Sequence, residues 1–203
     1  MNAFAQATDL PLLHGPNVYL AFVTEAHRES LRQLARDERI WEFTKTLLLT
    51  DTYNEQFDKY FNEALATAGP NGQGFVICNT ADDSVIGMTR IYEVDLKYKR
   101  GLIGHTWYIP AVWGKIYNKE CKLLLLQYLF ETKELQRVEF RVASQNIRSQ
   151  KAVQKIGGIR EGILRRFQFR NDGSPTDTHI FSILIEEWKE EKKSRLLQLA
   201  TSH

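Results

Sequence analysis

The sequence has few of the residues that mark disulfide-rich, metal-binding or low-complexity proteins. Its 203 residues include only two cysteines and five prolines, and no internal repeat is present. Cys78 and Cys121 are far apart in the sequence and do not have the spacing of a metal site. We therefore expect two reduced, structural cysteines and no bound metal, as is typical of a cytosolic protein.

The chain also lacks an excess of charge and any long apolar run. Its 27 Lys and Arg against 25 Asp and Glu give a net charge of +2, too small to indicate a nucleic-acid or membrane surface. No stretch approaches the roughly 18 apolar residues of a membrane span. Residues 1–13 have neither the basic start nor the apolar run of a signal peptide. We expect a cytoplasmic protein without nucleic-acid or membrane partners.

The composition is sufficient for one ordinary domain, since 43% of the residues are hydrophobic and 26% are charged. We expect residues 1–203 to form a single α/β (α+β) domain. Its core runs from about residue 11 to residue 188, and residues 186–199 form a charged C-terminal helix.

The most informative stretch lies between residues 103 and 162. Residues 103–109 are apolar, β-branched or aromatic, which predicts a buried strand. A loop at residues 113–118 leads to an apolar periodicity that predicts a helix over 119–133. Four unpaired amides and the positive end of the helix dipole meet at such a helix start, so a pyrophosphate can bind there.

The next part repeats this pattern of strand, loop and helix. Residues 137–143 predict a strand with Val138, Phe140 and Val142 on one face. Asn146 is the expected N-cap of a helix over 147–156, which the glycines at 157–158 end.

Other periodic segments complete the expected secondary structure. Further strands are expected at 18–23, 74–79, 85–94, 164–169 and 179–185, and helices at 24–43 and 51–68. The first dozen or more residues are expected to be unstructured. The turn at 171–173 joins the last two strands because Asn and Gly tolerate positive φ.

These residues resemble motifs A and B of the GNAT superfamily of acyl-CoA-dependent N-acetyltransferases. The order is strand, Trp-Gly-Lys-x-x-Asn, helix, Arg-Val-Glu-Phe-Arg-Val, Asn-x-x-Ser and Lys-x-Gly. The similarity is greatest to the branch that contains the ribosomal-protein N-terminal acetyltransferases. It implies a mixed, largely antiparallel central sheet flanked by helices, with splayed strands at the cofactor site.

The resemblance also implies acetyl-CoA as co-substrate and a set of residues that bind it. Backbone groups of a strand would hold the pantetheine, amides of a loop and helix start would hold the pyrophosphate, and Ser149 would protonate the leaving thiolate. The implied cofactor-binding residues are Trp107, Tyr108, Ile109, Lys115, Ile116, Tyr117, Asn118, Lys119, Asn146 and Ser149. The alternative is that Asn146 is only a helix cap and Ser149 only a first-turn residue.

The pyrophosphate loop departs from the usual family pattern. The slots for Gln or Arg, Gly, and Gly or Ala hold Trp113, Ile116 and Asn118. Ile116 does not easily take the positive φ that glycine allows, so we expect weakened cofactor binding at this loop. One branch of the family carries Asn-Thr-Glu-Ala-Lys where residues 118–122 are Asn-Lys-Glu-Cys-Lys, which indicates a subfamily trait.

The glutamate that often serves as general base falls on Leu102, which cannot take a proton. The remaining candidates for the base are His105, Glu93 and Glu139, because histidine titrates near neutrality and carboxylates accept protons. The alternative is that His105, a single histidine in a strand, has only a structural role. His179 is a weaker candidate on the same grounds.

Trp41 and Glu93 are the expected contacts with the acceptor. By resemblance the segment of Trp41 borders the acceptor pocket, and the alternative is an aromatic core residue. The predicted function is transfer of acetyl from acetyl-CoA to a primary amine, such as a protein or peptide N-terminus.

Two other functions are considered. The first is an acyl-CoA-binding regulatory module without turnover, in keeping with Leu102, Ile116 and Asn118. A Rossmann-type nucleotide binder is excluded because no Gly-x-Gly-x-x-Gly follows a strand. The acceptor and the oligomeric state, including a homodimer, stay open.

Overall fold

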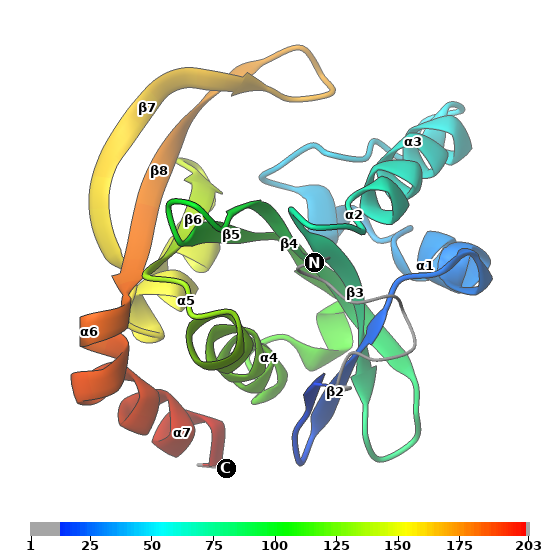
Figure 1. Ribbon diagram of the computed structural model, residues 1–203. Helices are drawn as coiled ribbons and strands as arrows, with labels where there is room; N and C mark the ends of the chain where they lie inside the picture. Colours follow the sequence, from blue (N-terminus) through cyan, green and yellow to red (C-terminus); the bar gives the residue numbers. More distant parts are fainter. Residues whose placement is uncertain (1–12, 202–203) are drawn as a thin grey trace.

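The computed structural model describes residues 13–201 and contains an eight-stranded sheet (Figure 1). The strand order is β1-β2-β3-β4-β5-β6-β8-β7, and neighbours are antiparallel except for the parallel pair β5 and β6. The strands are β1 Leu13–His14, β2 Val18–Phe22, β3 Gln73–Asn79, β4 Val85–Asp95, β5 Arg100–Tyr108, β6 Arg137–Ala143, β7 Ile159–Phe169 and β8 Pro175–Leu184.

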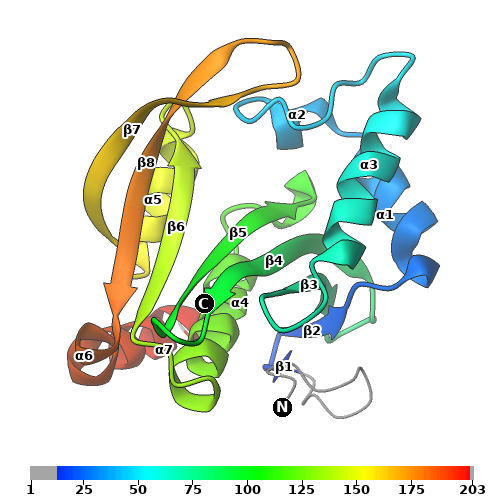
Figure 2. The ribbon, with the colours of Figure 1, turned by 45° about the horizontal axis from the view of Figure 1, so that its top comes forward.

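Helices cover both faces of this sheet (Figures 1 and 2). One face carries α1 Arg28–Leu34, α2 Glu38–Trp41 and α3 Tyr53–Ala66, and the other carries α4 Tyr117–Gln127, α5 Ile147–Lys155 and α7 Lys193–Thr201. The short turns are η1 Glu25–His27, η2 Pro110–Val112, η3 Tyr128–Thr132, α6 Ile185–Glu187 and η4 Trp188–Lys192.

The alternation of β6 shows how the sequence assigns its residues to the two faces. Val138, Phe140 and Val142 are buried in the core under α4 and α5, as predicted. The intervening Glu139 and Arg141 point to the opposite face, because successive strand residues alternate. The second core lies under α1 and α3.

The parallel strands β5 and β6 separate soon after they begin. They pair only at residues 100–102 of β5 and residues 137–139 of β6, although both continue for several more residues. Figure 2 shows the two strands diverging. The predicted mixed sheet with splayed strands is therefore confirmed, and beyond Leu102 the edge of β5 that faces β6 is not paired with another strand.

Several element boundaries differ from the predictions. The helix after the loop begins at Tyr117, two residues early, and passes into the wider turn η3 after Gln127. The last two strands are longer than expected, starting at Ile159 and Pro175. The expected unstructured start is wrong for β1, which pairs with β2, and residues 1–12 lie outside the described residues. None of the helices within residues 13–201 has the length and apolarity to cross a membrane.

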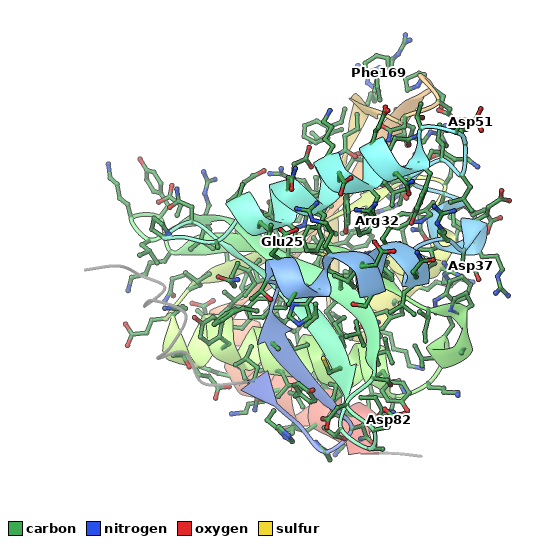
Figure 3. The ribbon with its side chains drawn as sticks, turned by 90° about the vertical axis from the view of Figure 1, so that its right-hand side faces the viewer. Glu25, Arg32, Asp37, Asp51, Asp82 and Phe169 are labelled. Atoms are coloured by element: carbon green, nitrogen blue, oxygen red, sulfur yellow. The ribbon has the colours of Figure 1, made fainter. Side chains whose placement is uncertain are left out.

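The hairpin of β7 and β8 reaches over to the first half of the chain. At its tip the Asn171 amide N donates to the Lys45 carbonyl at 3.2 Å and the side chain Nδ2 donates to the Thr46 carbonyl at 2.5 Å. Figure 3 shows Phe169 at this tip, and Arg32 between α1 and α3, where it pairs with Asp58. The hairpin and the segment before α3 thus enclose the sheet face opposite α4.

Candidate active site

The loop between β5 and α4 reverses at Gly114. Gly114 has φ +76°, whereas Ile116 has φ −66° and is the N-cap of α4. Ile116 therefore does not need the positive φ that glycine allows, which is required two residues earlier, where a glycine is present. The expected weakening of cofactor binding stays a prediction.

The start of α4 presents a row of free amide donors. Among residues 13–201 the backbone N–H groups of Gly114, Ile116, Tyr117 and Asn118 have no hydrogen-bond acceptor. The two ends of the predicted set differ, since the amide of Lys119 donates to the Ile116 carbonyl at 3.0 Å and that of Lys115 to the Val112 carbonyl at 3.4 Å. Three of the five predicted amides are therefore available to a pyrophosphate.

Two buried charged residues hold this helix start in place. Glu120 is 1% exposed and accepts hydrogen bonds from Asn17 N (2.8 Å), Asn17 Nδ2 (2.7 Å) and Val18 N (3.1 Å). Lys122 Nζ donates to Thr106 Oγ1 on β5 at 2.8 Å, and burial lowers the pKa of Lys122 to about 8. The helix is thus tied to β2 and to β5.

Sequence patterns did not single out Glu120 and Lys122. Both belong to the Asn-Lys-Glu-Cys-Lys segment, which differs from its branch pattern only at its second and fourth positions. The Glu and Lys shared with that branch were the available indication that these charges are structural.

A cation–π contact joins the two sides of the splay at its open end. The Trp113 indole Nε1 donates to the Tyr108 carbonyl at 2.9 Å, which holds the ring at the end of β5. Arg148, in the first turn of α5, places its guanidinium carbon 3.8 Å from the centroid of the Trp113 ring. The starts of α4 and α5 are therefore neighbours.

Asn146 and Ser149 lie in that same first turn of α5. Asn146 Oδ1 accepts a hydrogen bond from Ser149 N at 3.0 Å, so the predicted helix cap is confirmed. The Ser149 hydroxyl has no hydrogen-bond partner among the described residues and is partly accessible.

His105 lies at a β-bulge of β5 with φ +50°, on the face opposite α4. The residue as a whole is exposed, but its ring packs edge-on against Tyr92 with 5.1 Å between centroids. Desolvation in this recess, and secondarily the Arg90 guanidinium, lowers the pKa of His105 below its usual value. The imidazole is therefore neutral near pH 7 and is a weak base.

Trp41 and Trp107, unlike Trp113, are core residues. Trp41 is 5% exposed and donates from Nε1 to the Ala35 carbonyl at 2.8 Å. Its ring lies 5.8 Å from that of Trp107, which is itself buried and donates to the Tyr60 hydroxyl. The side chain of Trp41 thus packs as an aromatic core residue, and its contact with an acceptor stays a prediction. Trp107 can meet a ligand only through its backbone.

Glu93 and Glu139, the carboxylates proposed as general base, lie beside Leu102, where the family often has a glutamate. Leu102 is 5% exposed and pairs with Tyr92 on β4 and with Glu139 on β6. Glu93 follows Tyr92 directly, so a carboxylate stands on each side of Leu102. His179 lies on β8, beyond β6. Within residues 13–201 no group of three His, Cys, Asp or Glu side chains is close enough to hold a metal ion.

Comparisons with known proteins agree with this geometry. The sequence matches the family model described as an acetyltransferase (GNAT) domain over residues 17–159. YdaF of Bacillus subtilis, provisionally named a ribosomal N-acetyltransferase, is 33% identical over 112 residues, which are 55% of this chain and 60% of YdaF. The chain thus covers less than two thirds of that relative.

Two solved structures have the same fold. A crystal structure from T. thermophilus, provisionally named an acetyltransferase, has a TM-score of 0.79 and 28% identity, and the match covers 91% of this chain and 94% of that one. RimJ of Mycobacterium smegmatis, solved with CoA-disulfide, has a TM-score of 0.76 over 91% and 92% of the two chains. At 21% identity, that likeness shows the fold alone.

Proposed function

Since the chain belongs to the GNAT family of acetyltransferases, we propose that it moves an acetyl group from acetyl-CoA to a primary amine. The observation that supports this most is the row of free amides at Gly114, Ile116, Tyr117 and Asn118, placed at the open end of the splay between β5 and β6. An anionic diphosphate suits such a helix start because the donors and the helix dipole both favour negative charge.

In this proposal β5 and the start of α4 bind different parts of acetyl-CoA. The unpaired edge of β5 beyond Leu102 can donate and accept hydrogen bonds along an extended pantetheine arm. Holding the two reactants in one orientation contributes about 7–11 kcal/mol in well-oriented model reactions. Placement by β5 and α4 therefore supplies much of the rate without a strong base.

The chemical step moves one proton off the amine and one onto sulfur. The amine nitrogen attacks the thioester carbonyl carbon, the carbon–sulfur bond breaks, and the thiolate takes a proton. We assign that proton donation to Ser149, whose hydroxyl is unpaired among the described residues. The second proton lost by the nitrogen as the amide forms returns through water to Ser149. The proton of the ammonium leaves to water, because Leu102 cannot accept it and His105 is a weak base.

The acceptor we favour is a protein or peptide N-terminus. An α-amine with pKa near 8 is about a third neutral at about pH 7.5, whereas an alkylamine with pKa near 10 is less than about one per cent neutral. A site without a strong base therefore acts faster on α-amines than on lysine side chains or polyamines.

Two measurements test the proposal. Calorimetry should show acetyl-CoA binding, and thiol release should follow when peptides with free N-termini, polyamines or aminoglycosides are added. Binding without thiol release from any amine would favour the regulatory module, which Leu102 at the base position suggests. If acetyl-CoA does not bind, the proposal is contradicted.

A further inference from the structure

A cavity of about 500 Å³ lies at the closed end of the splay, on the face opposite α4. Its lining is mainly charged and comes mostly from β4, β5 and β6. The charged lining residues are Glu93, Asp95, Arg100, Arg137, Glu139 and Arg141. Leu102 also lines the cavity, so the cavity lies next to the position where the family often has a glutamate.

The two carboxylates beside Leu102 are not equally available. Glu139 accepts from Arg141 Nε at 2.8 Å with one oxygen and from Arg137 Nη2 at 3.1 Å with the other, and its side chain is 17% exposed. Glu93 accepts from Arg141 Nη1 at 3.0 Å with Oε1 only, and its side chain is 53% exposed. Its second oxygen, Oε2, has no partner among the described residues.

The backbone of β4 turns Glu93 toward this cavity. The strand register shifts between Tyr92 and Asp95, and Glu93 within this bulge has φ +49°. β-Bulges re-aim side chains and are common beside active sites. A non-glycine residue at positive φ is strained, and such strain persists where the surrounding structure holds the residue in place.

We propose that Glu93 binds the ammonium form of the acceptor through Oε2, while Arg141 fixes the carboxylate through Oε1. This inference rests on the proposed function, since it names the group that receives the acceptor of that reaction. Arg141 is a positioning residue: it acts through Glu93 and is itself held by Glu139.

The charges of the lining also select the class of acceptor. Three carboxylates and three guanidiniums line the cavity, and among the described residues the ion pairs leave Glu93 Oε2 and the Asp95 carboxylate without a guanidinium. An ammonium can pair with Glu93 Oε2, whereas a second cationic group that extends along the cavity would meet Arg100 or Arg137. The site therefore favours a monocationic amine, such as a peptide N-terminus, over a polyamine.

The test measures binding of L-alaninamide in the absence of acetyl-CoA, so it does not depend on turnover. The groups facing Glu93 are Arg141 and Glu139 on β6, Arg100 on β5, and Tyr92 and Asp95 on β4. At about pH 6.5, where the probe is cationic, Glu93→Gln should weaken its binding about tenfold, as expected for loss of a charged hydrogen-bond partner. At about pH 9.5 the probe is neutral, and the two proteins should bind it nearly equally.

Glu161→Gln is the matched control. Glu161 pairs with Arg137 in the same network but does not line the cavity, so this variant should bind the probe as the parent does. Equal binding by Glu93→Gln and parent at about pH 6.5 would overturn the inference, as would an equal loss in Glu161→Gln. The proposed function fails on a different result, the absence of thiol release from acetyl-CoA with every amine.

Discussion

Arg148 and Trp113 connect the start of α5 with the loop before α4, with 3.8 Å between the guanidinium carbon and the ring centroid. Because these two segments belong to opposite sides of the splay, the contact ties the cleft together at its open end. Trp113, which occupies the first slot of the pyrophosphate loop, therefore has a structural role.

Arg148→Ala should lower the free energy of unfolding by about 0.5–1 kcal/mol, the usual range for an exposed cation–π contact. Denaturant titration measures this value. Arg160→Ala is the control, because Arg160 is exposed and no aromatic contact is found for it in the described part of the chain. Equal stability of the two variants would show that the stacking contributes nothing.

Glu120→Ala should be much more destabilising, by about 3 kcal/mol. The change leaves three donors from Asn17 and Val18 without their buried acceptor, and an unsatisfied buried donor costs about 1–3 kcal/mol. Glu190→Ala, at an exposed position, should stay within about 0.5 kcal/mol of the parent. A loss below about 1 kcal/mol for Glu120→Ala would contradict the anchoring role.

The buried ammonium of Lys122 makes stability depend on pH in a defined window. Its pKa is lowered from 10.5 to about 8, so between about pH 8 and 10.5 the unfolded chain binds more protons than the folded one. Stability therefore rises with pH across that window, and the burial penalty is fully present below about pH 8.

Comparison with Lys122→Met isolates this contribution, because other titrating groups cancel in the difference. The stability of the parent relative to Lys122→Met should rise by about 2 kcal/mol between about pH 7.5 and about pH 9.5. Thermal or denaturant unfolding at both pH values measures it. A constant difference would mean that the lysine titrates normally in the folded protein.

Ser149→Ala should lower kcat and leave the KM for acetyl-CoA nearly unchanged, because proton donation to the thiolate matters in the transition state and not in binding. Ser84→Ala, in the β3–β4 turn, is the control and should match the parent. If Ser149→Ala also keeps the parental kcat, Ser149 is only the residue that Asn146 caps.

The pH profile of kcat/KM should show no titration of His105 near about 6.5, the usual pKa of histidine. Desolvation, aided by Arg90, lowers the pKa of His105, so the ring is already neutral where the assay operates. We expect kcat/KM to climb toward the pKa of the acceptor in both the parent and His105→Ala. A plateau near about pH 6.5 that disappears in His105→Ala would instead identify His105 as the base.

Local patterns in the sequence were enough to predict the elements that build the cleft. The alternation of Val138, Phe140 and Val142 predicted β6 with its correct bounds, and Asn146 predicted the cap of α5. Each prediction depends on residues a few positions apart, where strand period and cap chemistry decide the structure.

Features that depend on contacts distant in sequence could not be predicted in this way. Glu120 is buried because Asn17 lies against it, about a hundred residues earlier in the chain. The bulge that exposes Glu93 depends on how β4 and β5 pair with each other. The residues of either strand alone do not indicate this register. The correct position of the loop reversal, Gly114, was visible as a glycine but was expected two residues later.

The most direct test uses one peptide that carries both a free α-amine and a lysine side chain, incubated with acetyl-CoA and the 203-residue chain. Mass spectrometry then locates any added acetyl group. We predict one acetyl group on the α-amine, formed together with free CoA thiol. A peptide that stays unmodified while acetyl-CoA binds, or one acetylated faster on its lysine, would contradict the proposed function.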